Sequence, residues 1–285
     1  MELSIIIINY NTSAFTIKCI QSIYQFTKTL QFEIILVDNA STENDPINFL
    51  ERFPEIILIK NPINEGFAKG NNRGIQQAKG EVILLLNNDT EIRDGAIESA
   101  YQILKENSHI SVVTGKLIFP DGQIQHQCGR FPSVALQLIE LVRIQKILPK
   151  RVRESLLLGG FFDHSSPVYP DWIWGTFFMF NRSVLNIFPD GKLSETYFMY
   201  MEDMEWCYRI RKFGLKIFYD PSISIVHYSR ASSTSFFGAT LNPLILENFK
   251  HLLNRERGWL YAKLYFFLGS LIEVSTIRNW RSPKR

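Results

Sequence analysis

Several stretches of the first half of the chain are continuous runs of apolar residues, and most of them stop at Asn or Asp. Strands that are buried on both faces have such runs, whereas strands with one solvent-exposed face alternate between apolar and polar residues. Segments with helical periodicity lie between these runs, so the order predicts right-handed crossovers and a mainly parallel sheet. The expected strands are 3–10, 32–41, 54–61, 81–89 and 110–119, and the expected helices are 15–26, 65–80 and 94–107.

The second half is less regular. Residues 134–158 form an apolar and basic helical stretch that Pro149 interrupts, and 171–185 reads as a strand that enters a helix. A further helix is expected over 197–214, and short strands over 216–230. No internal repeat and no clear linker occurs before about residue 240. We expect one α/β domain over 1–240, with a first half 1–118 and a second half 119–240, and a helical extension over 241–285.

Composition indicates a folded, globular protein. The 285 residues can bury a large core, and 46% of them are hydrophobic and 21% charged, without low-complexity runs. The three cysteines lie far apart, which argues against a disulfide framework or a zinc site and for a reducing compartment. No basic segment precedes the first apolar run, so this run is expected to be a strand rather than a signal peptide. A cytoplasmic location is therefore expected.

Positive charge is concentrated at the C-terminal end. Residues 250–285 contain eight Lys or Arg and two Glu, a net charge of +6, which leaves −3 for residues 1–249 out of the total of +3. A nucleic-acid-binding domain would carry its basic patch on the folded body. The charge distribution therefore argues against a nucleic-acid partner.

Polar residues follow three of the predicted strands. They are the segment Asn9-Tyr10-Asn11, Asp38, and the segment Asn87-Asn88-Asp89. Each alone could be a turn or a helix cap. In open parallel sheets, however, ligands bind at the carboxyl ends of the strands. Three polar ends at one edge therefore indicate a site, in which Asp89 is a hard oxygen ligand for a divalent cation that bridges a diphosphate.

Two other groups of residues have both structural and functional interpretations. Glu202, Asp203 and Glu205 begin a predicted helix, where acidic residues interact favourably with the helix dipole, but one of them could be a general base. His227 ends a predicted strand and by itself is more often structural. The glycines 66, 70 and 74 are spaced by four after the third strand, which does not match G-x-G-x-x-G and argues against a dinucleotide-binding dehydrogenase.

Taken in order, these pieces resemble family 2 glycosyltransferases, especially the bacterial rhamnosyltransferase-like branch. The resemblance covers residues 4 to about 258. It implies a GT-A fold, a Rossmann-like central sheet flanked by helices, and transfer of a sugar from a nucleotide diphosphate with inversion. The stretches that carry it are SIIIINYN, ILVDNAS, NEGFAKGNNRGI, LLLNNDT, WGTFFMFNRSVL, YFMYMEDMEWCYRIRKFGLKIFYDPSISIVH and ENFKHLLNRERG.

The resemblance assigns roles to individual residues. Asp89 and His227 would hold Mg²⁺ or Mn²⁺, and Asp203, with Glu202 beside it, would be the general base. The first position of the family's Asp-x-Asp element is Asn87 here, a ribose or outer-shell candidate. Asp38 would read the pyrimidine base. The acceptor side would include Trp174 and Gly175, and the remaining donor-binding candidates are Asn9, Tyr10, Asn11, Asn64, Gly66, Asn72 and Asn88.

The implied activity is metal-dependent, inverting sugar transfer to a saccharide or lipid-linked acceptor in surface polysaccharide or lipopolysaccharide assembly. dTDP-rhamnose is the first donor expected and a UDP-sugar the second. A nucleotidyltransferase is the first alternative, but it would need a Gly-rich, basic phosphate loop where this chain has NYNTSAF. A non-catalytic nucleotide-sugar-binding module is the second, and the acidic residues argue against it.

The C-terminal segment 258–274 is rich in Leu, Phe, Tyr and Trp. Its longest uncharged run, Leu264 to Ile272, is shorter than the ~20 residues that a membrane-spanning helix needs. Basic residues beside it are typical of an interfacial helix on an anionic membrane such as the inner face of the cell membrane. The alternatives are a helix docked on the body and a helix that pairs two copies in a homodimer.

Overall fold

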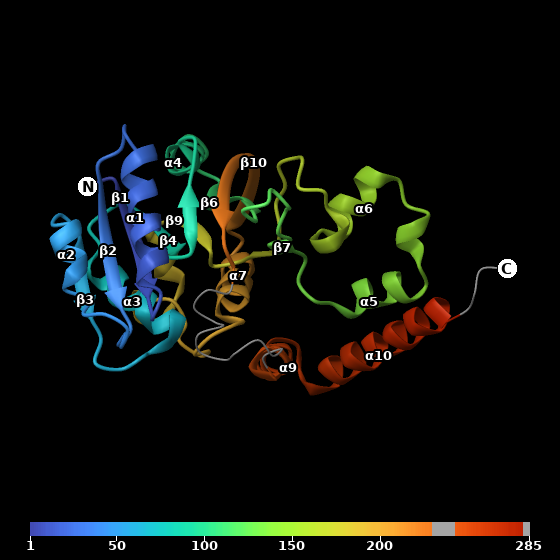
Figure 1. Cartoon of the computed structure of the whole chain (residues 1–285). Coiled ribbons are helices and arrows are strands. Elements are labelled where there is room, and N and C mark those ends of the chain that lie inside the picture. The colour runs from blue at the N-terminus through green and yellow to red at the C-terminus, as the bar shows by residue number, and fades with distance from the viewer. Residues whose placement is uncertain (230–242, 282–285) are drawn as a thin grey trace.

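The computed structural model describes residues 1–229 and 243–281 (Figure 1). An eight-stranded sheet forms its centre, in the order β3-β2-β1-β4-β9-β6-β10-β5. The four strands at one side are parallel, as is the β6–β10 pair, whereas β9 and β5 run antiparallel to their neighbours. Their bounds are β1 Leu3–Asn9, β2 Phe32–Asp38, β3 Ile57–Lys60, β4 Val82–Asn87, β5 Thr90–Ile92, β6 Ile110–Ile118, β9 Phe177–Asn181 and β10 Lys216–His227.

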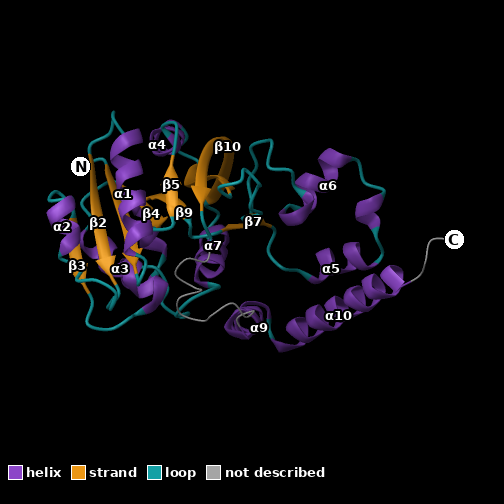
Figure 2. Ribbon diagram, viewed as in Figure 1, coloured by secondary structure: helices purple, strands orange, loops and turns teal. Residues whose placement is uncertain are grey.

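Helices cover both faces of the sheet (Figure 2). Along β1, Ile5 and Ile7 join the core under α1 and α4, while Ile6 joins the core under α3 and α7. Both faces are therefore apolar, which explains the continuous apolar runs and confirms the predicted mixed α/β class. The helices are α1 Ser13–Phe26, α2 Asn48–Arg52, α3 Gly66–Gln77, α4 Ala96–Glu106, α5 Val134–Leu141, α6 Lys150–Leu157, α7 Glu202–Lys212, α9 Pro243–Arg257 and α10 Trp259–Arg281.

Two glycines let α3 approach the sheet closely. A Cβ atom on Gly74 would lie 2.5 Å from Ile6 Cγ2, and one on Gly70 would lie 2.9 Å from Ile8 Cδ1. Neither distance is tolerable for a real side chain. The spacing of four thus serves close packing of the helix on β1.

The strand that was predicted to enter a helix is β9, which a 3₁₀ helix follows over Arg182–Ile187. The second half differs from its prediction elsewhere: α7 begins only at Glu202, and 216–227 is a single strand rather than several short ones. The register of β10 against β6 is irregular between Asp220 and Ser224, where Pro221 cannot donate a ladder hydrogen bond. The short elements of this half are β7 Cys128–Gly129, β8 Trp172–Ile173 and the 3₁₀ turns Ile144–Lys146, Gly159–Phe161 and Pro189–Gly191.

Helix α10 leaves the body and runs beside α5, whereas α9 lies below α7 (Figure 1). Tyr261 Oη accepts a hydrogen bond from Val134 N at 3.0 Å, so one side of α10 is docked on α5. Helix α9 is tied to the segment before α7, because Asn248 Nδ2 donates to the carbonyl oxygens of Met199 and Tyr200. Among the described helices, none combines the length and the apolar character needed to cross a membrane.

Candidate active site

The polar ends of β1, β2 and β4 meet, as their sequence positions predicted. Asn9 Nδ2 donates to Asp38 Oδ2 at 2.7 Å, and Thr16 Oγ1 donates to Asn9 Oδ1 at 2.7 Å. Asn88 Nδ2 donates to Thr16 Oγ1 at 2.8 Å and to Thr12 Oγ1 at 2.7 Å. All these side chains are buried. The parallel register of β1 with both neighbours brings them together, and the network fixes the start of α1 against the sheet.

The three residues after β4 therefore have different environments. Asn88 points into the buried network just described. Asn87 Nδ2 donates weakly to Thr176 Oγ1 at 3.4 Å, and Asn87 Oδ1 is buried without a hydrogen-bond partner in the described part of the chain. Asp89 lies next to His227. In this motif the Asn88 amide joins the buried network, Asn87 presents a buried oxygen at the strand end, and the Asp89 carboxylate lies beside His227.

Strand register places Asp89 beside His227. In the antiparallel pairing of β5 with β10, Thr90 is opposite His227, and Tyr228 N donates to the Asp89 carbonyl at 2.9 Å. Asp89 Oδ1 is consequently 3.3 Å from His227 Nε2, and each side chain is 6% exposed. The two residues assigned to the metal, far apart in sequence, are neighbours.

A residue that sequence reasoning missed, Gln125, orients this histidine. Its Nε2 donates to the His227 carbonyl at 2.7 Å, so its Oε1 faces His227 Nδ1, also at 2.7 Å. Nδ1 must then carry a proton, and Nε2 is the ring nitrogen directed toward Asp89. Gln125 is itself fixed, since its N donates to Leu117 O at 2.9 Å. The only sequence signal was Gln at alternate positions 123, 125 and 127.

This arrangement fits a divalent cation. A carboxylate oxygen and an oriented imidazole nitrogen are suitable ligands for Mn²⁺, and the carboxylate also suits Mg²⁺. No cluster of three or more His, Cys, Asp or Glu side chains that could hold an ion occurs among the described side chains. Asp89 and His227 would be two of the ligands of such a cation.

The acidic pair at the start of α7 follows an unusual backbone conformation. Tyr200 and Met201 have φ values of +68° and +74°, in the left-handed region that non-glycine residues rarely adopt. The chain thereby turns sharply into α7. Asp203 Oδ2 accepts a hydrogen bond from Gly175 N at 3.0 Å, and its Oδ1 accepts one from Met204 N at 2.7 Å. These two bonds hold the carboxylate in one orientation.

Gly175 is required by this packing. A Cβ atom there would lie 2.9 Å from Phe67 Cε1 and 3.7 Å from Asp203 Cβ. Trp174 N donates to Gln127 O at 3.0 Å, which fixes the Trp174-Gly175 segment beside Asp203. Gly175, one of the two predicted acceptor-side residues, is thus in direct contact with the predicted base.

The two carboxyl groups differ in their electrostatic environment. Burial raises the pKa of Asp203, while the hydrogen bonds from Gly175 and Met204 oppose that rise. Burial, and then the charge of Asp203, raise the pKa of Glu202 well above its ordinary value. Glu202 Oε2 is also buried without a hydrogen-bond partner among the described residues. The amide hydrogen bonds therefore favour the charged form of Asp203, whereas burial favours the protonated form of Glu202.

The comparison with known proteins decides the family. The sequence family described as "Glycosyl transferase family 2" matches residues 4–187, well over half of the chain. The protein is a member of glycosyl transferase family 2.

Relatives of this family 2 glycosyltransferase act on glycans. It is 25% identical over 252 residues to an N-acetylglucosaminyl-diphospho-decaprenol L-rhamnosyltransferase of Mycobacterium tuberculosis, covering 84% of this chain and 80% of the relative. It is 26% identical over 240 residues to the low-salt glycan biosynthesis hexosyltransferase Agl10 of Haloferax volcanii, covering 82% and 70% of the two chains. The predicted rhamnosyltransferase-like resemblance is confirmed.

Solved structures confirm the GT-A fold of the enzyme. GalNAc-T7 with UDP, GalNAc and Mn²⁺ superposes with a TM-score of 0.66 at 15% identity, over 91% of this chain and about half (49%) of that one. The mannosyltransferase PcManGT of Pyrobaculum calidifontis, in complex with GDP-Man and Mn²⁺, superposes with a TM-score of 0.55 at 15% identity, over 98% and 82%.

The remaining predicted donor residues of the glycosyltransferase lie around this edge of the sheet. Asn11 Oδ1 accepts a hydrogen bond from Thr42 N at 2.7 Å. Tyr10, the residue between Asn9 and Asn11 in the chain, is half-buried. Asn64 Oδ1 accepts from Gly66 N at 2.9 Å. Gly66 has a φ of +81°, and a Cβ there would lie 2.3 Å from Phe198 O. Asn64 and Gly66 thus shape the loop that begins α3, whereas Asn11 holds the segment that follows β2.

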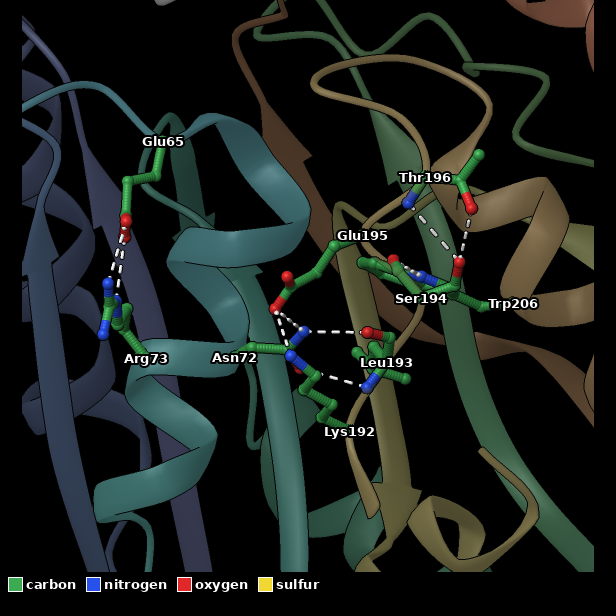
Figure 3. Close-up of polar contacts among 9 residues, drawn as sticks. All are labelled: Glu65, Asn72, Arg73, Lys192, Leu193, Ser194, Glu195, Thr196 and Trp206. Carbon is green, nitrogen blue, oxygen red and sulfur yellow. Dashed lines mark hydrogen bonds and ion pairs between the residues drawn. The ribbon is translucent and has the colours of Figure 1, made fainter. Parts of the chain in front are cut away.

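Asn72 connects the two halves of the enzyme (Figure 3). Its Nδ2 donates to Leu193 O at 2.8 Å and to Glu195 Oε1 at 2.9 Å, and its Oδ1 accepts from Leu193 N at 3.0 Å. On the other side of the same segment, Trp206 Nε1 donates to Ser194 O at 2.9 Å. Residues 193–195 are therefore held between α3 and α7, which fixes the approach to Asp203.

Proposed function

We propose that the protein is an inverting, metal-dependent glycosyltransferase that moves a sugar from a nucleotide diphosphate to a hydroxyl of a saccharide or lipid-linked acceptor, in the assembly of a cell-surface polysaccharide. The observation that carries the proposal is the Asp203 carboxylate, which the backbone amides of Gly175 and Met204 hold in one orientation. Burial and the charge of Asp203 raise the pKa of the neighbouring Glu202 well above its ordinary value, so the pair separates into a group suited to accept a proton and a group suited to keep one.

The donor would bind at the strand ends. Asp38 would contact the base, and the amide groups around Asn9 and Asn11 the nucleoside. Asp89 and His227 would hold Mg²⁺ or Mn²⁺, and the bound ion would neutralise the charge that develops on the leaving diphosphate. The Asn87 Oδ1 atom, which is buried without a partner among the described residues, is available to a ribose hydroxyl or to a water on the ion.

The reaction would be a single displacement. The acceptor oxygen forms a bond to the anomeric carbon, while the bond from that carbon to the diphosphate oxygen breaks and the electron pair leaves with the diphosphate. The acceptor proton goes to Asp203, which lies on the acceptor side next to Trp174 and Gly175. Attack opposite the leaving group inverts the anomeric configuration.

The similarity to an L-rhamnosyltransferase supports rhamnose as the transferred sugar and dTDP-rhamnose as the first donor to test. UDP-sugars come second, since a solved structure similar to this chain, S. aureus TarS 1-349 with a TM-score of 0.56 at 18% identity, contains UDP.

Calorimetry and product analysis test the proposal together. Wild-type protein is expected to bind dTDP or UDP with Mn²⁺ and to lose most of this affinity in EDTA. Asp89→Ala should show the same loss with Mn²⁺ present, because the diphosphate charge is left poorly compensated. Asp203→Asn should keep donor binding but release no nucleotide diphosphate from any donor and acceptor pair. Binding that is independent of both Asp89 and metal would refute the metal assignment, and full turnover by Asp203→Asn would refute the base.

A further inference from the structure

The α5–α6 segment and α10 form a separate group of helices beside the sheet domain, here called the helical arm (residues 134–161 and 259–272; Figure 2). Neither α5 nor α6 contains a buried residue. The arm contains 12 of the 21 large apolar side chains that are exposed in the described chain. Such a concentration of exposed apolar side chains on one group of helices is typical of an interaction site.

The exposed apolar residues of α10 form a stripe. At about 100° per residue, Leu260, Leu264, Phe267 and Leu271 fall within a sector of about 60°. Tyr261, through which α10 is docked on α5, lies outside this sector, on the flank that faces α5. Docking on the body and exposure of an apolar stripe are therefore compatible, because they use different sides of one helix.

The α5–α6 half of the arm exposes apolar residues as well, which the tail sequence alone did not suggest. Ile147 is 82% exposed and Val142 62% exposed, more than most apolar side chains on the sheet domain. The arm also has an excess of positive charge. Residues 134–161 contain five basic and two acidic residues, and 259–272 contain Lys263 and no acidic residue, a net +4 in a chain whose total is +3. In the sequence, residues 273–285 add four basic residues and one acidic residue.

We infer that the helical arm binds the surface of an anionic lipid bilayer, with its exposed apolar side chains in the interface and its Lys and Arg side chains at the headgroups. Apolar and aromatic side chains next to basic ones are the composition that favours this position. A second copy of the chain fits less well, since a twofold interface would place two surfaces of the same positive charge against each other.

Attachment through the arm would also orient the enzyme. Helix α9 joins the arm to the body and contacts the carbonyls of Met199 and Tyr200, directly before the Glu202-Asp203 pair. The arm would thus hold the acceptor side of the site near the bilayer. This consequence rests on the proposed function, but membrane binding itself does not, and it can be measured without donor or acceptor.

Vesicle flotation tests the inference. The full-length protein is expected to float with vesicles of equal parts phosphatidylglycerol and phosphatidylcholine, and not with pure phosphatidylcholine, and to dissociate at high salt. The double variants Val142→Asp/Ile147→Asp and Leu264→Asp/Phe267→Asp should each reduce the bound fraction at least tenfold. Ile63→Asp is the matched control, because Ile63 is 64% exposed on the sheet domain. It should float like the wild type.

Because all four altered side chains are exposed, the variants should keep the wild-type melting temperature. The charge-reversal variant Lys146→Glu/Arg151→Glu is a second, independent test, and it should also abolish binding to anionic vesicles. Three results would overturn the inference: no flotation of the wild type with anionic vesicles, equal flotation of the arm variants and the wild type, or a dimer in solution that the arm variants dissociate without any lipid binding. Asp203→Asn should float normally, which separates this result from the catalytic proposal.

Discussion

Replacing Gln125 by Leu would test how the chain orients its candidate metal ligand. Gln125 donates to the His227 carbonyl and accepts from His227 Nδ1, both at 2.7 Å, in a buried position. Leu has a similar size but offers neither group. The imidazole would lose the partner that fixes its tautomer and its ring orientation, and Nε2 would no longer be held toward Asp89.

The expected magnitude follows from these two bonds. Loss of a partner that orients a metal-binding histidine typically lowers metal affinity about 10- to 100-fold, which corresponds to roughly 1.4 to 2.8 kcal/mol. The carbonyl and the Nδ1–H of His227 would each be buried without a partner, at about 1 to 3 kcal/mol per group. In a chain of this length, each kcal/mol lowers the melting temperature by about 2 to 4 °C. The variant should therefore bind metal weakly and also melt earlier.

Electron paramagnetic resonance of free Mn²⁺, titrated with protein in the presence of UDP or dTDP, measures the affinity directly. Gln125→Glu should recover part of the binding, since a carboxylate still accepts from Nδ1. Gln123→Leu is the matched control and should bind Mn²⁺ like the wild type, because Gln123 is exposed and its side chain contacts Asp121. Wild-type Mn²⁺ affinity in folded Gln125→Leu would refute the reasoning.

Three other predictions concern the buried titratable groups. Asp203→Asn should lower the transfer rate by about 10²-fold or more while leaving the dissociation constant for the donor unchanged in calorimetry, because an amide cannot accept the acceptor proton. Glu202→Gln should raise the melting temperature at pH 8, and this gain should disappear toward pH 4. The pKa of Glu202 is raised in the folded state, so the wild type loses stability as the pH rises above the ordinary pKa of glutamate. Glutamine does not titrate and therefore avoids this loss. An unchanged melting temperature at pH 8 would contradict this. Burial raises the pKa of Cys19 and of Cys128 to about 12 and that of Cys207 even further, so mass spectrometry should find the native thiols unmodified after iodoacetamide at pH 8 and modified after unfolding.

Much of the site could be predicted from the sequence because the parallel half of the sheet is built from local units. Each strand, turn and helix follows the next in the chain, so the residues that end β1, β2 and β4 must share one edge. The hydrogen bonds among Asn9, Asp38 and Asn88 confirm that reasoning. The role of Asn88 was less predictable, since only the structure shows that its amide is used by α1 rather than by the approach to the site.

The sequence by itself determined the layers of this protein. Continuous apolar runs require strands that are covered on both faces, and helical periodicity between them supplies the covering helices. It also determined which residue types stand at the strand ends. These properties depend on neighbours in the chain, so periodicity and composition are enough to read them.

Only the tertiary structure decided which distant residues meet. Asp89 faces His227 because β5 turns back to pair with β10 in one register, and a shift by one residue would point the side chains to opposite faces. Asp203 meets the amide of Gly175, and His227 meets Gln125, through contacts between segments that no local pattern relates. Such pairings depend on strand order and register across the whole sheet. They follow from how side chains pack in the hydrophobic cores on the two faces of the sheet, and no short motif specifies them.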